Sequence, residues 1–464
     1  MSSGNHDALK GRLWHLDKSQ ALVDFVVRAN FEDLSEDALK YLKIFLMDTL
    51  AVGVGGLCSP GADIVLNSCK SWGEGDQVRV IGRPGVKLPA PSAAYVNGYQ
   101  IHALEWDGLH ESSVVICMCV TVAALMAEAE QNKISGKDFA LALIVAVEIA
   151  VLMGSGSNTA PKFFRPAVAG LMGAAMGIAK MRGFNREQTL QTLGLAYSQA
   201  SGTMQAHWEG EMMLAVQVGI SARAAICAAD LAEAGAQSPV DVLLGKFGFF
   251  RLFETADNID DVLDKLGTQW AITEMAHKPY PAGRATQSVL TMFMELFSDN
   301  KISIGEIEKI SVYVPPLIMF LVGRPLMEQM SASYARLCLK VIGPMMLLDG
   351  EIDPRKFPNK SAPTPDVKKL AELFHIELND VTDPNALGPQ SMTVLMKDGT
   401  KYNLDCAVPY GAPNNPMQRP AREQKVRKCF EVGRYSGDPQ KLIDLIEDIF
   451  SMEDVRELFS AVCD

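Results

Sequence analysis

Residues 97–120 read NGYQIHALEWDGLHESSVVICMCV and set a dense group of ionisable side chains between stretches of helix-compatible apolar sequence. Ten residues of this stretch include His102, Glu105, Asp107, His110 and Glu111. Histidine, and carboxyl groups with a shifted pKa, are the side chains that transfer protons near neutral pH. The stretch is therefore a candidate acid/base site at the centre of a helical fold.

Helical spacing would divide these side chains between two faces. Residues three or four positions apart lie on one face of a helix, so a helix would place His102 beside Glu105 and Asp107 beside His110. Gly108 indicates a break between the two groups. The alternative interpretation is a helix end with solvated carboxylates and with histidines that are hydrogen-bonded in the core. Spacing alone leaves the two interpretations evenly balanced.

The same residues carry a motif of a known family. NGYQIHALEWD, at 97–107, resembles the N-G-x-x-x-H-x-[LM]-[DE]-[FYW]-D segment of the MmgE/PrpD family. HKPYP, at 277–281, is similar to the K-[PR]-[YF]-P segment of that family. The family includes 2-methylcitrate dehydratases, cis-aconitate decarboxylases and iminodisuccinate epimerases. The resemblance extends over nearly the whole chain and implies a mainly α fold, with a large all-α helical domain and a smaller α+β lid domain.

Length and sequence pattern divide the chain in the same way. A chain of 464 residues is long enough for two domains, or for one large domain with an insertion. Alternating sequence at 309–314 and a hairpin pattern at 391–404 interrupt helical sequence rich in small residues. We expect a helical domain formed by residues 1–270 with 406–464, and an α+β lid domain formed by residues 271–405.

Apolar periodicity predicts the individual helices of the larger domain. The clearest are expected at 19–30, 35–54, 115–129, 186–200 and 220–234. Ser35 is the expected N-cap of the second of these helices.

Composition excludes several classes of function. The net charge of -12 and the lack of a basic run argue against a nucleic-acid partner. The nine cysteines are scattered without a CxxC pair, which is typical of buried thiols in a reducing compartment. GVGG at 53–56 follows no strand and is not a dinucleotide loop, and no nucleophile elbow is present. We therefore expect no cofactor and no metal.

Two further patterns bear on where the protein acts. The first twenty residues are polar and of mixed charge, unlike a secretory signal. The most apolar run, at 139–153, contains Glu148 and is shorter than a membrane span, so a buried core helix is expected. These patterns predict no membrane partner and a cytoplasmic protein, although an organelle lumen remains open. The resemblance also implies a homodimer that acts on a small-molecule substrate.

The resemblance implies a role for each site residue. It marks His102, Asp107 and Lys278 as catalytic. Five further residues are the expected substrate-binding groups: Glu105, His110, Arg165, Arg284 and Arg324. Arg165 stands where the family commonly has a histidine, at the start of a helix, which is a favourable place for an anion. A permanent cation there favours carboxylate binding over proton transfer.

Other positions depart from the family towards apolar residues. Leu214 and Ala215 replace a Lys-Arg pair that many relatives carry, and Leu321 lies where decarboxylases tend to have a tyrosine. The second histidine of the family has two possible matches in this chain. It corresponds to His110 in one register and to Ile116 in the other, and the flanking sequence favours Ile116.

Three functional hypotheses follow from these residues. An epimerase that moves a proton next to a carboxylate fits the variant segments best, because it needs no acid for a leaving group. A hydro-lyase or decarboxylase fits the family majority. The third hypothesis is a non-enzymatic protein, or a repurposed scaffold that binds or transforms a less polar metabolite without the ancestral activity, which the apolar replacements favour. If the first or second holds, Lys278 should lie within about 15 Å of His102 and Arg165 in one cleft between the domains.

Overall fold

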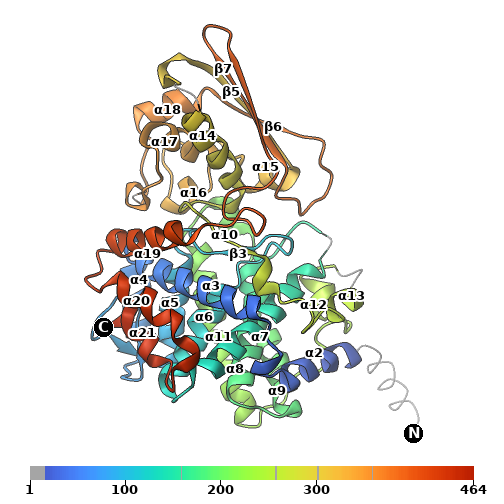
Figure 1. Ribbon diagram of the computed structural model, residues 1–464. Helices are drawn as coiled ribbons and strands as arrows, with labels where there is room; N and C mark the ends of the chain where they lie inside the picture. Colours follow the sequence, from blue (N-terminus) through green and yellow to red (C-terminus); the bar gives the residue numbers. More distant parts are fainter. Residues whose placement is uncertain (1–15, 158, 256–258, 300–301, 358) are drawn as a thin grey trace.

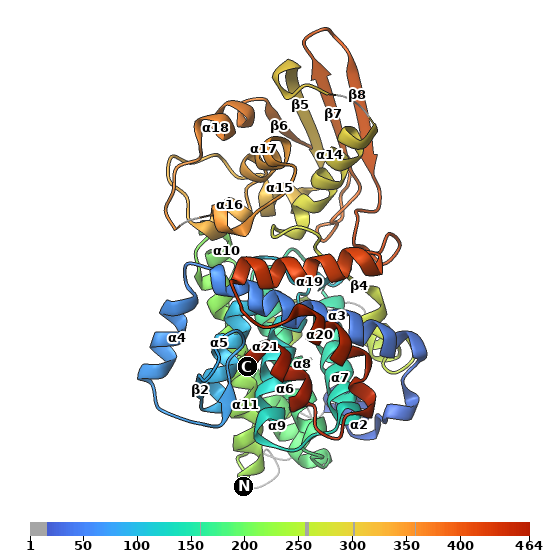
Figure 2. The same cartoon turned by 60° about the vertical axis from the view of Figure 1, so that its left-hand side comes forward.

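The computed structural model describes residues 16–157, 159–255, 259–299, 302–357 and 359–464, and within them the protein is mainly α (Figure 1). A large helical lobe carries a smaller lobe that contains most of the β-structure (Figures 1 and 2). The expectation about the secretory signal concerns the first twenty residues, of which 1–15 lie outside the described residues.

Helices make up most of the large lobe. They are α2 (Leu16–Arg28), α3 (Glu36–Gly55), α4 (Ala62–Ser71), α5 (Ala90–His102), α6 (Met118–Gln131), α7 (Gly136–Ser155), α8 (Arg165–Met181), α9 (Arg186–Ser198), α10 (Gln205–Glu209), α11 (Met213–Glu233), α12 (Phe249–Leu252), α13 (Ile259–Leu263), α19 (Arg419–Gly433), α20 (Pro439–Glu447) and α21 (Arg456–Cys463). Two short ribbons join them: β1 (Val78–Arg79) with β2 (Lys87–Leu88), and β3 (Leu109–His110) with β4 (Met275–Ala276).

The small lobe combines one sheet with helices. Its elements are α14 (Gln287–Asp299), β5 (Ile307–Val314), α15 (Pro316–Val322), α16 (Ala332–Arg336), α17 (Leu339–Asp349), α18 (Pro365–Ala371), β6 (Phe374–Leu378), β7 (Gln390–Met396) and β8 (Lys401–Cys406). The strand order is β6-β5-β7-β8, with β5 and β6 parallel and the other pairs antiparallel. The expected hairpin is confirmed as β7 and β8, whereas β6 was not expected.

The large lobe is built around closely packed helices. On α8, a Cβ atom added at Gly173 would lie 2.2 Å from the carbonyl oxygen of Ala146 on α7, so only glycine allows this approach. Gly177 also faces α7, whereas Gly170 faces Val120 on α6. The small residues that the sequence places on α8 therefore serve contacts with two different helices.

Most expected helices are present, with shifted ends. Ser35 caps α3 as expected, because its side chain accepts a hydrogen bond from the Ala38 amide. The helix expected at 115–129 starts at Met118 instead, since Val114 adopts a left-handed conformation with φ of 53°.

Helix α7, at 136–155, extends beyond both ends of the apolar run at 139–153. Three segments are long and apolar enough to cross a membrane by length and composition alone: Glu36–Cys58, Gly136–Ser155 and Met213–Glu233. The run at 139–153 lies within α7 and is buried, so the expected core helix is confirmed, although the whole helix is longer than the run and reaches the length of a span. The fold buries 89% of the most apolar window of α7 inside the protein, where it packs on α8.

Two apolar cores form within the described residues. One contains large-lobe residues between 22 and 275 and between 426 and 463, and the other contains residues between 282 and 406. Leu337 of the small lobe belongs to the core of the large lobe, so it links the two. The domain boundaries at 270/271 and 405/406, and movement of the small lobe as a lid, remain predictions.

Candidate active site

The acid/base stretch begins where α5 ends. The helix stops at His102, and Glu105 adopts a left-handed backbone conformation with φ of 54°. The expectation that His102 and Glu105 share a helix face was therefore wrong, because the chain turns five residues before the expected break at Gly108. A non-glycine residue in this conformation carries strain that the surrounding packing must hold in place. The turn at 103–107 folds the two carboxylates back towards His102.

A short antiparallel ribbon brings the second part of the site to this turn. Leu109 pairs with Ala276, and His110 pairs with Met275. Lys278 lies two residues beyond β4, and its ammonium group therefore reaches Glu105, 173 residues away in the sequence.

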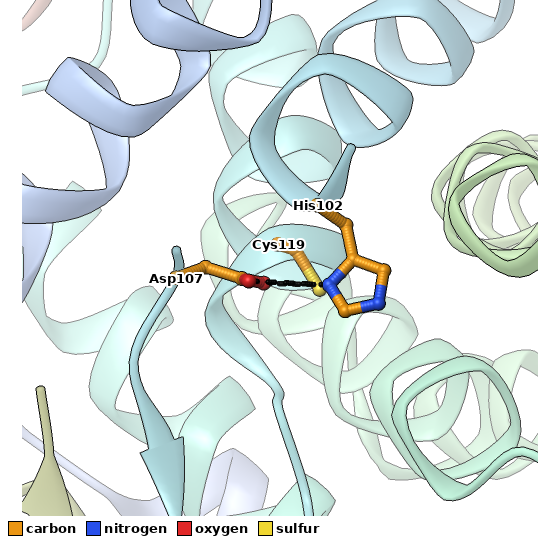
Figure 3. A group of neighbouring side chains, drawn as sticks. All are labelled: His102, Asp107 and Cys119. Atoms are coloured by element: carbon orange, nitrogen blue, oxygen red, sulfur yellow. Dashed lines mark hydrogen bonds and ion pairs between the residues drawn. The ribbon is translucent and has the colours of Figure 1, made fainter. Parts of the chain in front are cut away.

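The four side chains form one buried network. The Nδ1 atom of His102 lies 2.9 Å from Oδ2 of Asp107 (Figure 3). The ammonium of Lys278 donates to Oε2 of Glu105 at 2.9 Å and lies 3.6 Å from Oδ1 of Asp107. His102, Asp107 and Lys278 are at most 1% exposed. The structure thus brings together all three residues predicted as catalytic, with Glu105 beside them.

The network shifts the pKa of each of its four side chains towards the charged form. Burial disfavours the charged imidazole of His102, but the carboxylates of Asp107 and Glu105 outweigh burial and raise its pKa. Burial is likewise outweighed for Lys278, whose pKa is raised by the same carboxylates. The pKa of Asp107 is lowered to about 2, because His102 and Lys278 outweigh the effect of burial. Lys278 is therefore held as a cation and is a poor base at neutral pH.

The second nitrogen of His102 remains open. Nε2 lies 3.3 Å from Oε1 of Glu105, but it makes no hydrogen bond within the described residues. Asp107 holds the other nitrogen, which fixes the ring orientation and supports the imidazolium form. This arrangement makes Nε2 the atom suited to proton transfer. The ring lies 5.6 Å from that of Phe164, which lines the adjoining cavity.

Cys119 completes a trio that resembles a metal site. One atom each from His102, Asp107 and Cys119 lie within 4.8 Å of one another (Figure 3). A thiol binds a metal as the thiolate, but burial and the nearby Asp107 raise the pKa of Cys119 well above its usual value. The ammonium of Lys278 also lies beside Asp107. The three side chains therefore suit a hydrogen-bonded network better than a divalent cation.

A small, mostly apolar cavity of about 80 Å³ adjoins the network. Its charged or titratable lining residues are Glu105, Arg165, His207 and Arg284. Its apolar lining includes Leu109, Val114, Ile116, Pro161, Phe164, Pro166, Met204, Leu321, Val322, Leu337 and Leu387. Burial, followed by the nearby Arg324, lowers the pKa of His207 to about 3 and keeps this imidazole neutral.

Arg165 lines this cavity, but protein groups already occupy its guanidinium. It forms a buried ion pair with Glu254, with Nε 2.7 Å from Oε1. Further hydrogen bonds go to Ser157, Thr159 and Asn385. Arg165 therefore has no free pair of donors for a substrate carboxylate in this conformation. The carboxylate of Glu254, 89 residues away in the sequence, already occupies them.

We expect the Glu254→Gln substitution to lower stability rather than to weaken substrate binding. The substitution leaves the guanidinium of Arg165 buried without a counter-charge. Loss of a hydrogen bond to a charged group lowers the free energy of unfolding by about 2–3 kcal/mol. Chemical denaturation measures the loss directly. Unchanged stability combined with tighter carboxylate binding would instead show that Glu254 competes with the substrate for Arg165.

Arg284 and Arg324 offer donors that protein groups do not occupy. Arg284 lines the cavity and pairs with Glu111 at 2.8 Å, while its Nη2 is buried without a partner. Arg324 donates to Nδ1 of His207 at 2.7 Å, and its Nη1 is also buried without a partner. Among the described residues, Arg324 makes no ion pair with a carboxylate. Both arginines therefore keep an open donor; Arg284 lines the cavity itself, and Arg324 contacts His207 of the cavity lining.

His110 lies outside this cavity. Its Nδ1 is 2.9 Å from the hydroxyl of Ser113, and its Nε2 is 3.3 Å from Glu274. It lines a separate cavity that also contains Glu148. Ile116, the alternative match to the second histidine of the family, lines the central cavity instead.

Arg336 is a further residue of this region that the sequence did not single out. Its side chain is 1% exposed, and Nη1 donates to the carbonyl of Ala103 at 2.9 Å. Arg336 belongs to the small lobe, whereas Ala103 follows His102 at the end of α5. It makes no ion pair with a carboxylate within the described residues, and burial lowers its pKa. An arginine without a neighbouring motif gives no local signal of this contact.

We expect the Arg336→Lys substitution to lower kcat with little change in KM. A lysine keeps the charge, but it cannot reproduce the planar donor set that spans Ala103 and Pro354. A loss of about tenfold in kcat corresponds to a small displacement of the acid/base turn. Arg355→Lys, a change at a nearby arginine that pairs with Asp353 and Glu431, is the control. If the two substitutions lowered kcat equally, Arg336 would have no specific role in positioning the active site.

Comparison with known proteins agrees with the resemblance seen in the sequence. Profiles of the MmgE/PrpD N-terminal domain and the MmgE/PrpD C-terminal domain match residues 20–261 and 280–451. The human cis-aconitate decarboxylase is 25% identical over 92% of this chain and 90% of its own length. A cis-aconitate decarboxylase of Aspergillus terreus is 30% identical over 52% of each chain. These similarities support an enzyme of the lyase type, and the chain belongs to the MmgE/PrpD family.

Proposed function

We propose that this protein is a cofactor-independent lyase that decarboxylates a small di- or tricarboxylate. The observation that carries the proposal is the buried Asp107–His102 pair, whose open Nε2 atom lies beside Glu105 at the edge of the cavity. A protonated imidazole is the acid that a decarboxylation needs, because the carbon that loses a carboxyl group must gain a proton. The named activity of the similar human and fungal proteins agrees with this choice.

The proposed step balances without a further reactant. The bond between the carboxylate carbon and the substrate carbon breaks, and carbon dioxide leaves. The electron pair remains on the substrate carbon, delocalised onto a neighbouring carboxylate, until His102 delivers the proton from Nε2. Solvent then returns a proton to His102.

Fixed charges around His102 assist this step. Arg324, with its unpartnered Nη1, is the proposed anchor for a substrate carboxylate. Lys278 acts through its charge, since it keeps Glu105 and Asp107 ionised around the imidazolium. Such preorganised charges stabilise the charge that develops in a transition state.

A second candidate takes a substrate with an apolar substituent. The cavity presents Ile116, Leu321 and Leu387 to the reacting region, and apolar walls of this kind favour apolar ligand groups. In this candidate the acid/base chemistry is unchanged, and one carboxylate with an apolar arm replaces the polycarboxylate. Epimerisation and dehydration also begin with proton transfer next to a carboxylate, and product analysis distinguishes them.

Product analysis in D₂O tests the proposal. We expect release of carbon dioxide from a di- or tricarboxylate, together with one solvent deuterium at the carbon that lost the carboxylate. Exchange of substrate C–H without loss of carbon dioxide would support an epimerase instead. A thermal shift with apolar monocarboxylates, but not with citrate-like acids, would favour the second candidate.

The rate should depend on pH through His102 in its acid form. Because the pKa of His102 is raised above 6.5, kcat should be constant at lower pH and should fall as the pH rises through this higher pKa. Asp107, with a pKa of about 2, stays ionised throughout. The Asp107→Asn substitution should move the falling limb to lower pH, because it removes the carboxylate that raises the pKa of His102. An unmoved limb in a pH–rate profile would contradict this role of His102.

We propose a cytoplasmic homodimer, following the expectation from the family and from the sequence pattern. Sedimentation at micromolar concentration tests the dimer, and a monomer there would contradict it.

A further inference from the structure

A third cavity lies on the large lobe, away from the cavity beside His102 and from the cavity lined by His110. It encloses about 230 Å³ between α3, the segment 411–418 and the first turns of α19. None of its lining residues contributes to the cavity beside His102. Lys40, Arg419 and Arg422 line it, and none of the described residues that line it is acidic.

Two of these cations are not held in ion pairs, although Glu36, Glu423 and Glu447 line an adjoining cavity that Lys40 and Arg422 also line. Arg422 donates to the carbonyl of Met417 at 2.7 Å, while its Nε is buried without a partner. Within the described residues, neither Arg422 nor Lys40 forms an ion pair. Arg419 differs, since it binds Glu423 at 2.8 Å. Cations that share a cavity repel one another unless an anion enters.

His277 supplies an independent observation at the same cavity. The side chain is 3% exposed, stacks on Phe45 at 4.3 Å, and lines the cavity. Its Nε2 atom is buried and makes no hydrogen bond within the described residues. Buried polar atoms are almost always satisfied, so an unsatisfied one points to an absent partner. Burial and the cations Lys425, Arg422 and Arg284 lower its pKa well below the usual value, which leaves a neutral ring able to donate one N–H.

The N-terminus of α19 opens onto the same space. Gln418, its N-cap, makes no side-chain capping bond, and the first turn contains no acidic residue. The first amides of a helix lack partners inside the helix and favour an anion. Arg419 and Arg422, in the first turns of this helix, line the same cavity.

We infer that this cavity binds a small oxyanion, held by Arg422, Lys40 and His277. Phosphate and small carboxylates present the compact negative charge that these donors bind. Helix α19 also connects this cavity to the active site. One turn along α19, Lys425 donates to the carbonyl of Trp106 at 2.8 Å, within the turn that carries Glu105 and Asp107.

Titration calorimetry at low ionic strength tests the inference with inorganic phosphate and, in a second arm, with acetate. We expect saturable binding of at least one of them to the wild-type protein. Arg422→Gln and Lys40→Gln should each weaken this binding by about tenfold or more, since each removes a charged donor. Arg427→Gln is the matched control on the same helix, because Arg427 does not line the cavity.

A further variant separates this cavity from the active site. Arg324→Gln changes the proposed substrate anchor and should leave phosphate and acetate binding unchanged. Loss of binding in Arg324→Gln, with binding retained in Lys40→Gln and Arg422→Gln, would overturn the inference, as would the absence of saturable binding to the wild-type protein. If circular dichroism shows that Arg422→Gln does not fold, Lys40→Gln decides, since Lys40 is exposed on α3.

Discussion

The His102→Gln protein should fold normally and turn over its substrate roughly 10²–10⁴ times more slowly than the wild-type protein, the usual range for loss of a general acid. Glutamine preserves a polar side chain of similar reach beside Asp107, so the main loss is the proton at Nε2. The measurement is kcat with the substrate that the product analysis in D₂O identifies. The effect should fall on kcat, because His102 acts on the reacting carbon and makes no expected contact with the substrate carboxylates.

His375→Gln is the control for this substitution. His375 is exposed on β6 in the small lobe and contacts none of the four network residues. It should leave kcat within about twofold of the wild-type value, as is usual for surface substitutions away from a site. If His102→Gln retained similar activity, His102 would not be the acid, and Lys278 would be the next candidate.

Replacing Lys278 by methionine should lower kcat by about 10²-fold or more. Lys278 separates two buried carboxylates that lie close together, and its ammonium contacts both Glu105 and Asp107. Without it, the pKa of one carboxyl group must rise, because like charges in a buried site do not both remain ionised. A protonated Glu105 or Asp107 no longer supports the imidazolium of His102. The falling limb of the pH–rate profile should therefore move to lower pH along with the loss of rate.

The pH profile distinguishes two roles for Lys278. A lower rate with a shifted limb supports action through charge, whereas a lower rate with an unshifted limb would identify Lys278 as the proton-transferring group. Lys401→Met, a change at an exposed residue of β8, is the control and should alter neither quantity. A variant at Lys278 with full activity would contradict both roles.

The sequence alone was sufficient for the general architecture and for the position of the network. Local periodicity predicted α3, including its cap at Ser35, and alternation predicted the hairpin of β7 and β8. Short motifs identified His102, Asp107 and Lys278, and the structure brings these side chains together. The helix and the hairpin are predictable because they depend on residues close in sequence. The site residues are predictable because each belongs to a short motif that can be recognised by itself.

Only the tertiary structure decided which charges remain free. Arg165 satisfied every local rule for an anion site at a helix start, yet Glu254 neutralises it from 89 residues away. Arg336 gave no local signal, yet it holds the carbonyl of Ala103 across 233 residues. The pairing of a buried charge depends on which distant element packs beside it, and the cost of burying an unpaired charge forces such pairs to form. For that reason the sequence by itself determined the family, the helical fold and the residues of the buried network, whereas long-range packing decided that Arg284 and Arg324, and not Arg165, keep an open donor.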